Sequence, residues 1–527
     1  MFKYSRIRFF IICSLFCVVF SNELYAQNAV YVRGKIVSED KGEAIPFTSI
    51  ALKKNNIGVY ANEEGDFLFS DHKAFYSDSL VITSIGYRRK ALLFSSLKKN
   101  AMNIITLSPA TIDFDEIIVS EKRRRKPSAS TIISRAISKI RENYPQKPFS
   151  YISYYRDYQK HKDEYLNFNE AIVQSLDNGF NRVYWNNKYR LLDYKKNEDF
   201  PRINLSTHYT QTTDYDKPTK VIPRAIIEDQ NGNELFMLVV HDAIRNYNTR
   251  TYSFVYRFNK DFIPNHLFEK PKITYNSDIP LYEIDFTGNP GIQRDSLEIT
   301  GTIYIQPHDY SIHKLDYTCS YRDRRQERHE IYHISTEYGY DENKSMQLKY
   351  LSFRNAFDTV DPQDSTYFRI TESHWRAGPS AITLILNFNN PIDEVSAKQK
   401  ANYDILVGSK KAKVSNVIVQ GTRMFIDLKD VSAPDLKEGS AIGFENKRLS
   451  DINGRILGVK RLIHLNQYRE LFVQEYNRPL LFEKDCLMDY MPVEKNCISK
   501  PQGEFNYWMN TPKGKLNDLE TAIGHQD

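Results

Sequence analysis

Residues 31–119 decide the fold, because short apolar segments recur there about every ten residues. They include Val32–Val37 (VRGKIV), Ala44–Leu52 (AIPFTSIAL), Asn62–Phe69 (NEEGDFLF) and Asp78–Tyr87 (DSLVITSIGY). Gly, Asp, Asn and Pro residues separate these segments. Short β-type segments divided by such turn residues are typical of a β-sandwich. We therefore predict a small sandwich at the head of the chain.

The order of the turns resembles the carboxypeptidase-regulatory-like domain, a transthyretin-like fold that is common in envelope proteins of Bacteroidetes type. The matching marks are Gly34, Gly42–Pro46, Glu64–Phe67, Ile85–Tyr87 and the closing segment Phe114–Val119. The domain accompanies some carboxypeptidases, but the resemblance implies no catalytic residue within it. Many TonB-dependent transporters carry the same domain, and this chain has no room for their barrel. The resemblance therefore implies a docking or adhesion unit in an exported protein.

The N-terminus has the composition of a secretory signal peptide, which we place at residues 1–26. Basic residues precede the apolar stretch Phe9–Phe20, and Leu24–Ala26 is a suitable cleavage site. The apolar stretch is shorter than the about 20 residues that a membrane span needs, so cleavage is favoured over an uncleaved anchor. We therefore predict a protein of the periplasm or the outer membrane.

The net charge of the full chain is +6, and one local run explains most of it. The predicted signal contributes +2, and the run Lys122, Arg123, Arg124, Arg125 and Lys126 contributes +5. The remainder is near neutral, which disfavours nucleic-acid binding, because that function needs basic residues spread over a folded face. We interpret residues 121–128 as a solvated linker, and the alternative is a peripheral contact with anionic lipid headgroups.

The middle of the chain, residues 129–376, combines one amphipathic helix with strand-like alternation. The apolar face of the helix consists of Ile132, Ile133, Ala136, Ile137 and Ile140. From Phe149 onward apolar and polar residues alternate, which predicts a large, curved antiparallel sheet. The helix is expected to pack on this sheet, an architecture that resembles the half-barrel of periplasmic lipoprotein carriers.

Three further segments complete a mainly β organisation. With its flanks, the N-terminal sandwich occupies residues 27–120. Residues 377–465 contain short strands such as Thr383–Phe388 and resemble the immunoglobulin-like modules of bacterial surface proteins. Residues 466–527 are less regular, and we interpret them as a C-terminal extension.

Three cysteines lie outside the predicted signal: Cys319, Cys486 and Cys497. Export permits disulfides. Cys486 and Cys497 are close enough in sequence to close a small loop, so a bridge and two thiols are both open. Cys319 lies in a strand-like run, which favours a buried free thiol.

One string, His329-Glu330-Ile331-Tyr332-His333, matches the H-E-x-x-H pattern of zinc peptidases. The pattern binds zinc on a helix, where both histidines share one face. Both flanks here look like strand, on which four residues span about 13 Å. We therefore favour sheet-surface histidines, with a zinc metallopeptidase using His329, Glu330 and His333 as the alternative. His161 and Glu164 match H-x-x-E, but they belong to a charged turn.

The sequence offers residues for two other kinds of site. Asp40, Glu64, Asp66 and Asp78 could offer oxygen atoms to calcium, although acidic residues at turns are usually turn formers. The chain has 36 tyrosines, which could stack on sugars or peptides. At period-two spacing in strands, tyrosines are more often core residues or cross-strand pairs.

The sequence thus favours a non-catalytic exported envelope protein, in which a docking domain is attached to a β domain that binds a partner or ligand. The bound partner or ligand would be an envelope protein, a glycan or a lipid-like molecule. The alternative is a periplasmic carrier of lipid-like molecules in the central half-barrel. No cofactor is predicted and no residue is assigned a catalytic role.

Overall fold

The computed structural model describes most of the chain between Tyr31 and Pro512. The described ranges are residues 31–54, 58–71, 73–99, 101–110, 127–162, 164–206, 208–217, 219–222, 227, 232–250, 256–291, 297–341, 344–378, 381–407, 410–429, 431, 442–476, 486–499, 507 and 509–512. The predicted signal peptide and the basic run from Lys122 to Lys126 lie outside these ranges. Among the described residues, no helix is both long and apolar enough to cross a membrane.

The chain folds into two units. Among described residues, unit 1 consists of residues 31–110 together with two short segments from farther along the chain, 274–280 and 510–512. The Gly86 amide, for example, donates to the Tyr275 carbonyl oxygen at 2.9 Å. Unit 2 holds the other described residues.

Unit 1 is a β-sandwich, as the sequence predicts. One sheet has the strand order β4-β1-β7 and the other the order β3-β2-β5-β6. The elements are β1 (Tyr31–Ser38), β2 (Ser49–Leu52), β3 (Gly58–Tyr60), β4 (Asp66–Ser70), η1 (Lys73–Phe75), β5 (Ser79–Thr83), β6 (Lys90–Leu93), η2 (Phe94–Ser96) and β7 (Met102–Leu107). A Cβ atom at Gly34 would lie 2.3 Å from the Phe67 ring, so only glycine lets that ring pack across β1.

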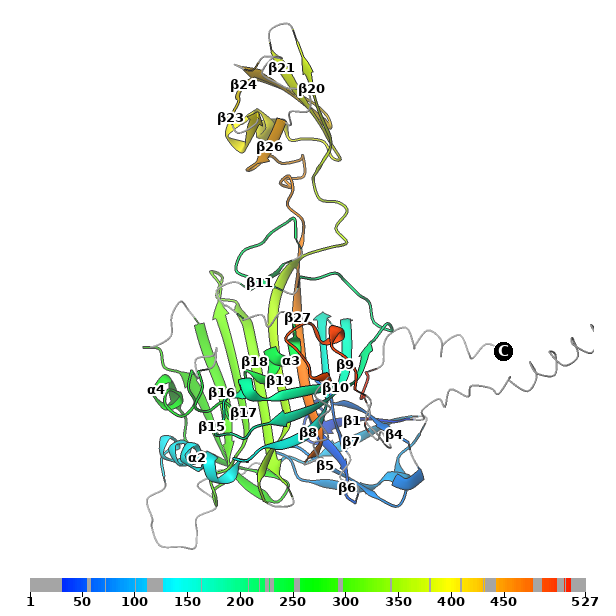
Figure 1. Cartoon of the computed structure of the whole chain (residues 1–527), viewed down its shortest axis with the longest axis vertical. Helices are drawn as coiled ribbons and strands as arrows, with labels where there is room; N and C mark the ends of the chain where they lie inside the picture. The colour runs from blue at the N-terminus through cyan, green and yellow to red at the C-terminus, as the bar shows by residue number, and fades with distance from the viewer. Residues whose placement is uncertain are drawn as a thin grey trace, which may run out of the picture. The chain divides into compact units, whose positions relative to one another are not determined.

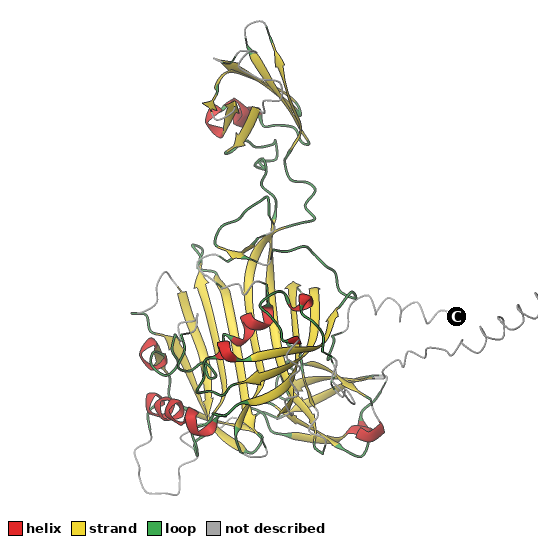
Figure 2. Cartoon of the chain, viewed as in Figure 1, coloured by secondary structure: helices red, strands yellow, loops and turns green. Residues whose placement is uncertain are grey.

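Unit 2 is built on a large sheet that is antiparallel along its main path, which also confirms the prediction (Figures 1 and 2). The path is β10-β9-β8-β27-β19-β18-β17-β16-β15-β13, with β11, β12 and β14 attached. The strands are β8 (Phe149–His161), β9 (Glu164–Asp177), β10 (Lys188–Lys196), β11 (Tyr209–Thr210), β12 (Lys220–Val221), β13 (His266–Phe268), β14 (Lys272–Asn276), β15 (Ile279–Gly288), β16 (Leu297–Ile305), β17 (Ile312–Arg322), β18 (Arg328–Tyr340), β19 (Met346–Val360) and β27 (Leu462–Tyr476).

The predicted helix is α2 (Ala129–Asn143), whose first turn is capped by Ser128 through the Thr131 amide. Its apolar face joins the core that covers one face of the sheet, hereafter the helix-covered face. Residues of a second, short helix, α3 (Glu234–Val239), belong to the same core. A further turn of helix, α4 (Phe262–Asn265), precedes β13. The sequence pattern indicated only α2, because α3 and α4 are too short to show a helical period.

A second, smaller sandwich is inserted between β19 and β27. Val360 pairs with Leu462, so the chain leaves the large sheet and returns to it at neighbouring positions. The inserted sandwich has the sheets β20-β21-β25-β24 and β23-β22-β26. Its elements are β20 (Ile370–Ala377), β21 (Ile382–Phe388), α5 (Glu394–Lys398), η4 (Lys400–Asn402), β22 (Tyr403–Val407), β23 (Lys410–Lys411), β24 (Lys413–Gln420), β25 (Arg423–Lys429) and β26 (Ile442–Asn446). At its base the Arg461 guanidinium pairs with the Asp361 carboxylate.

The structure differs from two expected boundaries. Residues 370–376 belong to the inserted sandwich and not to the large sheet. We expected residues 466–476 to begin an irregular C-terminal extension. They belong instead to β27, and β27 lies between β8 and β19. The sequence pattern of β27 is obscured because it buries Gln467, Arg469 and Glu470, all of which are paired with polar groups from other segments.

Two buried ionic clusters cross the strands at β8 and β27. On the face opposite the helices, the Arg156 Nε atom lies 2.5 Å from the Glu470 carboxylate, and both side chains are at most 2% exposed. On the helix-covered face, the Arg469 guanidinium pairs with Glu234 of α3 and donates to the Asn355 amide oxygen at 2.7 Å. These pairs join residues that are far apart in the sequence.

Candidate functional site

A depression of about 750 Å³ opens at the loop that joins β9 to β10. Its other wall is formed by residues 146–148, just before β8. Five amide side chains line it: Gln146, Asn178, Asn181, Asn186 and Asn187. Three cations and one aromatic ring also line it: Lys147, Arg182, Lys188 and Trp185. We call this feature the Trp185 depression.

Trp185 presents its ring to solvent from the short helix η3 (Tyr184–Asn186). Its side chain is 48% exposed, whereas that of the preceding Tyr184 is only 6% exposed. The two ring centroids lie 4.0 Å apart. Exposed aromatic side chains of this kind are enriched at binding surfaces, because they supply a large contact area at a small cost in conformational entropy.

A buried ion pair braces the loop from below. Arg245 donates to the Asp177 carboxylate from Nε at 2.6 Å and from Nη2 at 2.8 Å. The same guanidinium donates from Nη1 to the Arg182 carbonyl oxygen at 2.9 Å. Burial lowers the pKa of Arg245, but attraction to Asp177 outweighs burial and leaves this pKa raised. The Arg245 guanidinium therefore stays charged, and its hydrogen bonds fix the loop backbone.

Gly179 lets the two walls of the depression meet. Its φ is +96°, and a Cβ atom at this position would lie 2.4 Å from the Gln146 carbonyl oxygen. The next residue, Phe180, donates its amide to the Pro145 carbonyl oxygen at 2.9 Å. The loop is thus held against residues 145–147 by contacts that no larger residue would permit.

We predict that Gly179→Ala lowers the free energy of unfolding by about 2 kcal/mol, since the Cβ atom is disfavoured by both φ and the close carbonyl. Chemical denaturation of the variant checks this. The matched control is Gly458→Ala, which has a positive φ of +78° but no atom within 4 Å of the added Cβ. Equal losses in the two variants would contradict the role given to the close approach.

The lining of the depression suits a polar ligand that carries negative charge. It contains amides, cations and an aromatic ring, and no carboxylate, histidine or cysteine is among its residues. Amide groups offer both donors and acceptors, which suits hydroxyl groups. The electron-rich face of an indole attracts the weakly positive C–H face of a sugar ring. The three cations add a preference for negative charge.

The H-E-x-x-H string lies on β18, so the predicted strand is confirmed. Glu330 accepts two hydrogen bonds from Arg354, at 2.7 and 2.8 Å. His333 Nδ1 lies 2.9 Å from the Thr318 hydroxyl, and His329 Nε2 lies 3.3 Å from Asp323. The helix that would bring both histidines onto one zinc ion is not the structure of this segment.

The structure brings together one cluster that sequence reasoning missed. Asp323, Glu327 and His329 offer ligand atoms within 4.8 Å of one another and could hold a metal ion. Asp323 already accepts hydrogen bonds from the amides of Arg325 and Glu327, at 2.8 and 2.9 Å, and so forms the β17–β18 turn. This use of the carboxylate explains the cluster without a metal.

The other acidic and histidine candidates take part in local structure. Asp78 accepts hydrogen bonds from the Lys54 and Ser79 amides, and Asp66 pairs with Lys35. Two further side chains make similar local contacts: the Ser38 hydroxyl donates to Asp40, and His161 Nδ1 lies near the His464 carbonyl oxygen. Glu64 is half-buried just before Gly65, and Glu164 begins β9 after the β8–β9 turn.

The tyrosines of β8 are packed. Tyr154, Tyr155 and Tyr158 are each at most 2% exposed. Tyr158 stacks on Tyr468 and Phe168, with both centroid distances 4.9 Å. These rings are core residues and cross-strand pairs, which is the interpretation that the sequence favoured.

The lipid-carrier alternative needs an open apolar cleft in the central sheet. A cavity on the helix-covered face is lined by residues such as Tyr151, Tyr338 and Leu351 and holds about 20 Å³. That volume is close to the room needed by one water molecule. The cavity is therefore too small for a lipid chain.

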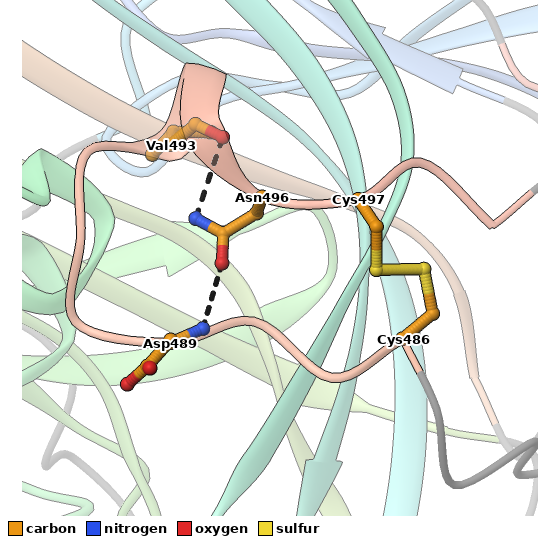
Figure 3. The surroundings of a disulfide bond; sticks show 5 residues. All are labelled: Cys486, Asp489, Val493, Asn496 and Cys497. Atoms are coloured by element: carbon orange, nitrogen blue, oxygen red, sulfur yellow. Dashed lines mark hydrogen bonds between the residues drawn. A yellow bond between two sulfur atoms is a disulfide. The ribbon is translucent and has the colours of Figure 1, made fainter.

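Cys486 and Cys497 form a disulfide, with their Cα atoms 5.7 Å apart. Figure 3 shows the loop that they close, in which the Asn496 side chain accepts from the Asp489 amide at 2.7 Å. The Met488 amide donates to a carbonyl oxygen of β10 at 2.8 Å. The disulfide loop is thereby attached to the strand that begins at the Trp185 depression.

Cys319 is the buried free thiol that the sequence predicts. It lies on β17 and is 2% exposed. Burial raises its pKa to about 12. The thiol therefore stays protonated and unreactive at neutral pH.

The sequence reasoning did not single out Trp185 or its neighbours. A usable signal was present, because the stretch from Asn178 to Lys188 contains four asparagines and one of only three tryptophans. Asparagine-rich loops between strands are common turn formers, so the stretch is not distinctive without the structure. Only the folded loop shows that Tyr184 is buried and Trp185 is not.

Comparison with known proteins identifies the N-terminal part of the chain. Residues 32–119 match the family described as CarboxypepD_reg-like domain. This part is a carboxypeptidase-regulatory-like domain. The match covers the sandwich of unit 1 and continues into residues outside the described ranges. It confirms the family resemblance found in the sequence and supports a non-catalytic module, but it does not reach the Trp185 depression.

The other comparisons give weaker results. The chain has no significant match among curated proteins. Among solved structures it is similar to a DUF1329 family protein from Desulfovibrio piger. The two share 8% identity at a TM-score of 0.21, over 44% of this chain and 87% of that one. This likeness carries no argument about function.

Proposed function

We propose that this chain is an exported, non-catalytic envelope protein that binds an acidic glycan in the Trp185 depression. The observation that supports the proposal most strongly is the exposed Trp185 ring, held on a braced loop among amides and cations. The charge of the lining favours sugars that carry carboxylates over neutral ones. The carboxypeptidase-regulatory-like domain serves as the docking unit, and the large sheet is the rigid support of the site.

The binding proposal is tested by calorimetry of the mature protein with oligogalacturonate, a polymer of uronic acids. The reference ligand is the same oligomer with its carboxylates reduced to alcohols. We expect the acidic form to bind more tightly, and its affinity to fall as salt is added. Equal affinities would overturn the charge preference, and the absence of binding to both forms would overturn the glycan proposal.

We predict that Trp185→Ala weakens oligogalacturonate binding at least tenfold, or about 1.4 kcal/mol, because it removes the stacking surface. The matched control is Trp375→Ala, which removes a ring that is 37% exposed on β20, outside the depression. Arg182→Gln is expected to weaken the acidic ligand and leave the reduced one unchanged. A loss of similar size in the Trp375 variant would contradict the assignment of the site.

The docking proposal is supported by exposed apolar residues of unit 1. Leu93, Met102 and Ile104 are 55%, 51% and 59% exposed. Met102 and Ile104 lie two positions apart on β7, so their side chains share one face of the strand. Such residues are expected to contact another envelope component.

Cell fractionation tests this docking role. The double variant Met102→Ser, Ile104→Ser is expected to leave the membrane fraction. Unchanged sedimentation of the variant with the membranes would contradict the docking role.

A further inference from the structure

The inserted sandwich presents one broad face that its own core does not use. On the sheet β20-β21-β25-β24, alternate residues such as Leu384, Leu386 and Ile426 point into the core. The residues between them therefore point to the other side of the sheet. They form three rows across all four strands, which together we call the outer face, and the pair Lys413 and Lys429 lies beyond one of the outer rows.

The central row of the outer face is largely apolar. In strand order it reads His374, Ile385, Phe425 and Ile418. Ile418 is 46% exposed, Phe425 is half-buried, and Ile385 is 9% exposed between its neighbours. A continuous apolar row with polar residues on both sides is a frequent feature of protein interfaces.

The two flanking rows carry opposite charges at corresponding positions. One row reads Glu372, Asn387, Arg423 and Gln420, and the other reads Arg376, Thr383, Asp427 and Asn416. On β20 the acid of the first row corresponds to a base in the second. On β25 the base of the first row corresponds to an acid in the second. The remaining positions are uncharged in both rows.

We propose that the outer face binds the same face of a second copy of this chain. A two-fold axis parallel to the apolar row exchanges the two flanking rows and keeps each strand opposite its own copy. Arg376 then faces Glu372 of the partner subunit, and Asp427 faces Arg423 of the partner subunit. Each contact occurs twice, and Phe425 packs on the partner subunit's Phe425. The charges select this pairing, because a shift by one row would set a charged residue of β25 against Phe425 of the partner subunit. A shift by two rows would oppose like charges on β25.

The outer face is small, so the dimer is expected to be weak. Four strands spaced about 4.8 Å apart give a width of less than about 20 Å. Contacts of this size lie at the low end of interface areas and are transient. Ion pairs at the rim contribute mainly to the selection of the partner, and the apolar row provides most of the affinity.

Sedimentation velocity of the mature full-length protein tests the proposal. We expect a shift from monomer to dimer at concentrations of about 10–100 µM, which corresponds to a weak dissociation constant. Arg423→Glu and Asp427→Arg are each expected to abolish the shift, since each places two like-charged pairs in the dimer. The control Lys410→Glu alters an exposed charge on β23, in the other sheet, and is expected to leave it unchanged.

Mixing the two charge variants gives the decisive result. A dimer of one Arg423→Glu chain and one Asp427→Arg chain contains only opposite charges at both β25 contacts. The mixture is therefore expected to regain the dimer that neither variant forms alone. A monomeric wild-type protein, or a mixture that stays monomeric, would overturn the proposal. So would unchanged dimers in both single variants, because another surface would then be responsible.

Discussion

Replacing Glu470 by glutamine is expected to lower the free energy of unfolding of the large sheet by about 3–5 kcal/mol. Glu470 is 1% exposed and receives the Arg156 guanidinium and the hydroxyl groups of Tyr158 and Tyr350. Glutamine keeps the shape but removes the negative charge that lies 2.5 Å from the buried guanidinium. Urea denaturation, with hydrogen exchange of the β8 and β27 amides to locate the loss, measures the effect.

An exposed pair provides the matched control. Arg322 and Glu298 lie 2.6 Å apart on neighbouring strands of the same sheet, but their side chains are 44% and 35% exposed. Glu298→Gln is expected to cost less than about 1 kcal/mol. The double replacement Arg156→Met, Glu470→Leu is expected to cost less than Glu470→Gln, because it removes both charges of the pair together. A similar cost for the two single variants would show that burial does not set the strength of the pair.

Replacing Asp157 by asparagine is expected to remove part of the loss of stability that the protein undergoes as pH rises. Asp157 is 7% exposed, and burial, together with repulsion from Glu234, raises its pKa to about 7. Folding favours the protonated form of Asp157. The carboxyl therefore makes its full contribution to the free energy of unfolding below about pH 4, where aspartate in the unfolded chain is also protonated. The contribution is lost as pH rises through 7. The difference amounts to at most about 4 kcal/mol.

Denaturation curves at pH 5 and pH 8 check this prediction. The wild type is expected to lose more stability between the two than Asp157→Asn does. Glu337, whose pKa burial also raises to about 7, should leave a residual slope in the variant. Asp193→Asn, at an exposed position on β10, is the control and should keep the wild-type slope. Identical slopes in wild type and Asp157→Asn would refute the buried carboxyl as their source.

The strand pattern was predictable where one face of a strand is apolar. The strand β8 and the helical face of α2 were both predicted from local patterns, although β8 is buried on both faces and not on one. The pattern failed at β27, because Arg469 and Glu470 are charged residues inside a sheet. Their burial depends on Glu234 and Arg156, which lie far away in the sequence. No local window contains that information.

The candidate site was less predictable than the fold. The sequence drew attention to His329 and His333, because their spacing matches a known chemistry on a helix. The sequence also predicted that the two histidines lie on a strand. In the structure His329 lies beside Asp323 and His333 lies beside Thr318, so the two do not share a ligand. The Trp185 depression had no comparable motif. Its loop is held by the ion pair of Asp177 and Arg245. These two residues are 68 positions apart in the sequence, so no local pattern shows that they meet.

The sequence by itself determined the carboxypeptidase-regulatory-like domain, the mainly β class and the position of α2, because turn residues and hydrophobic periods act over short distances. The tertiary structure alone decided that β27 completes the large sheet, that a sandwich is inserted before it, and that Trp185 is exposed. Register between distant strands follows from buried pairs such as Arg156 with Glu470. Such pairs are stable only when the two partners are brought together out of water, so their role exists only in the folded chain.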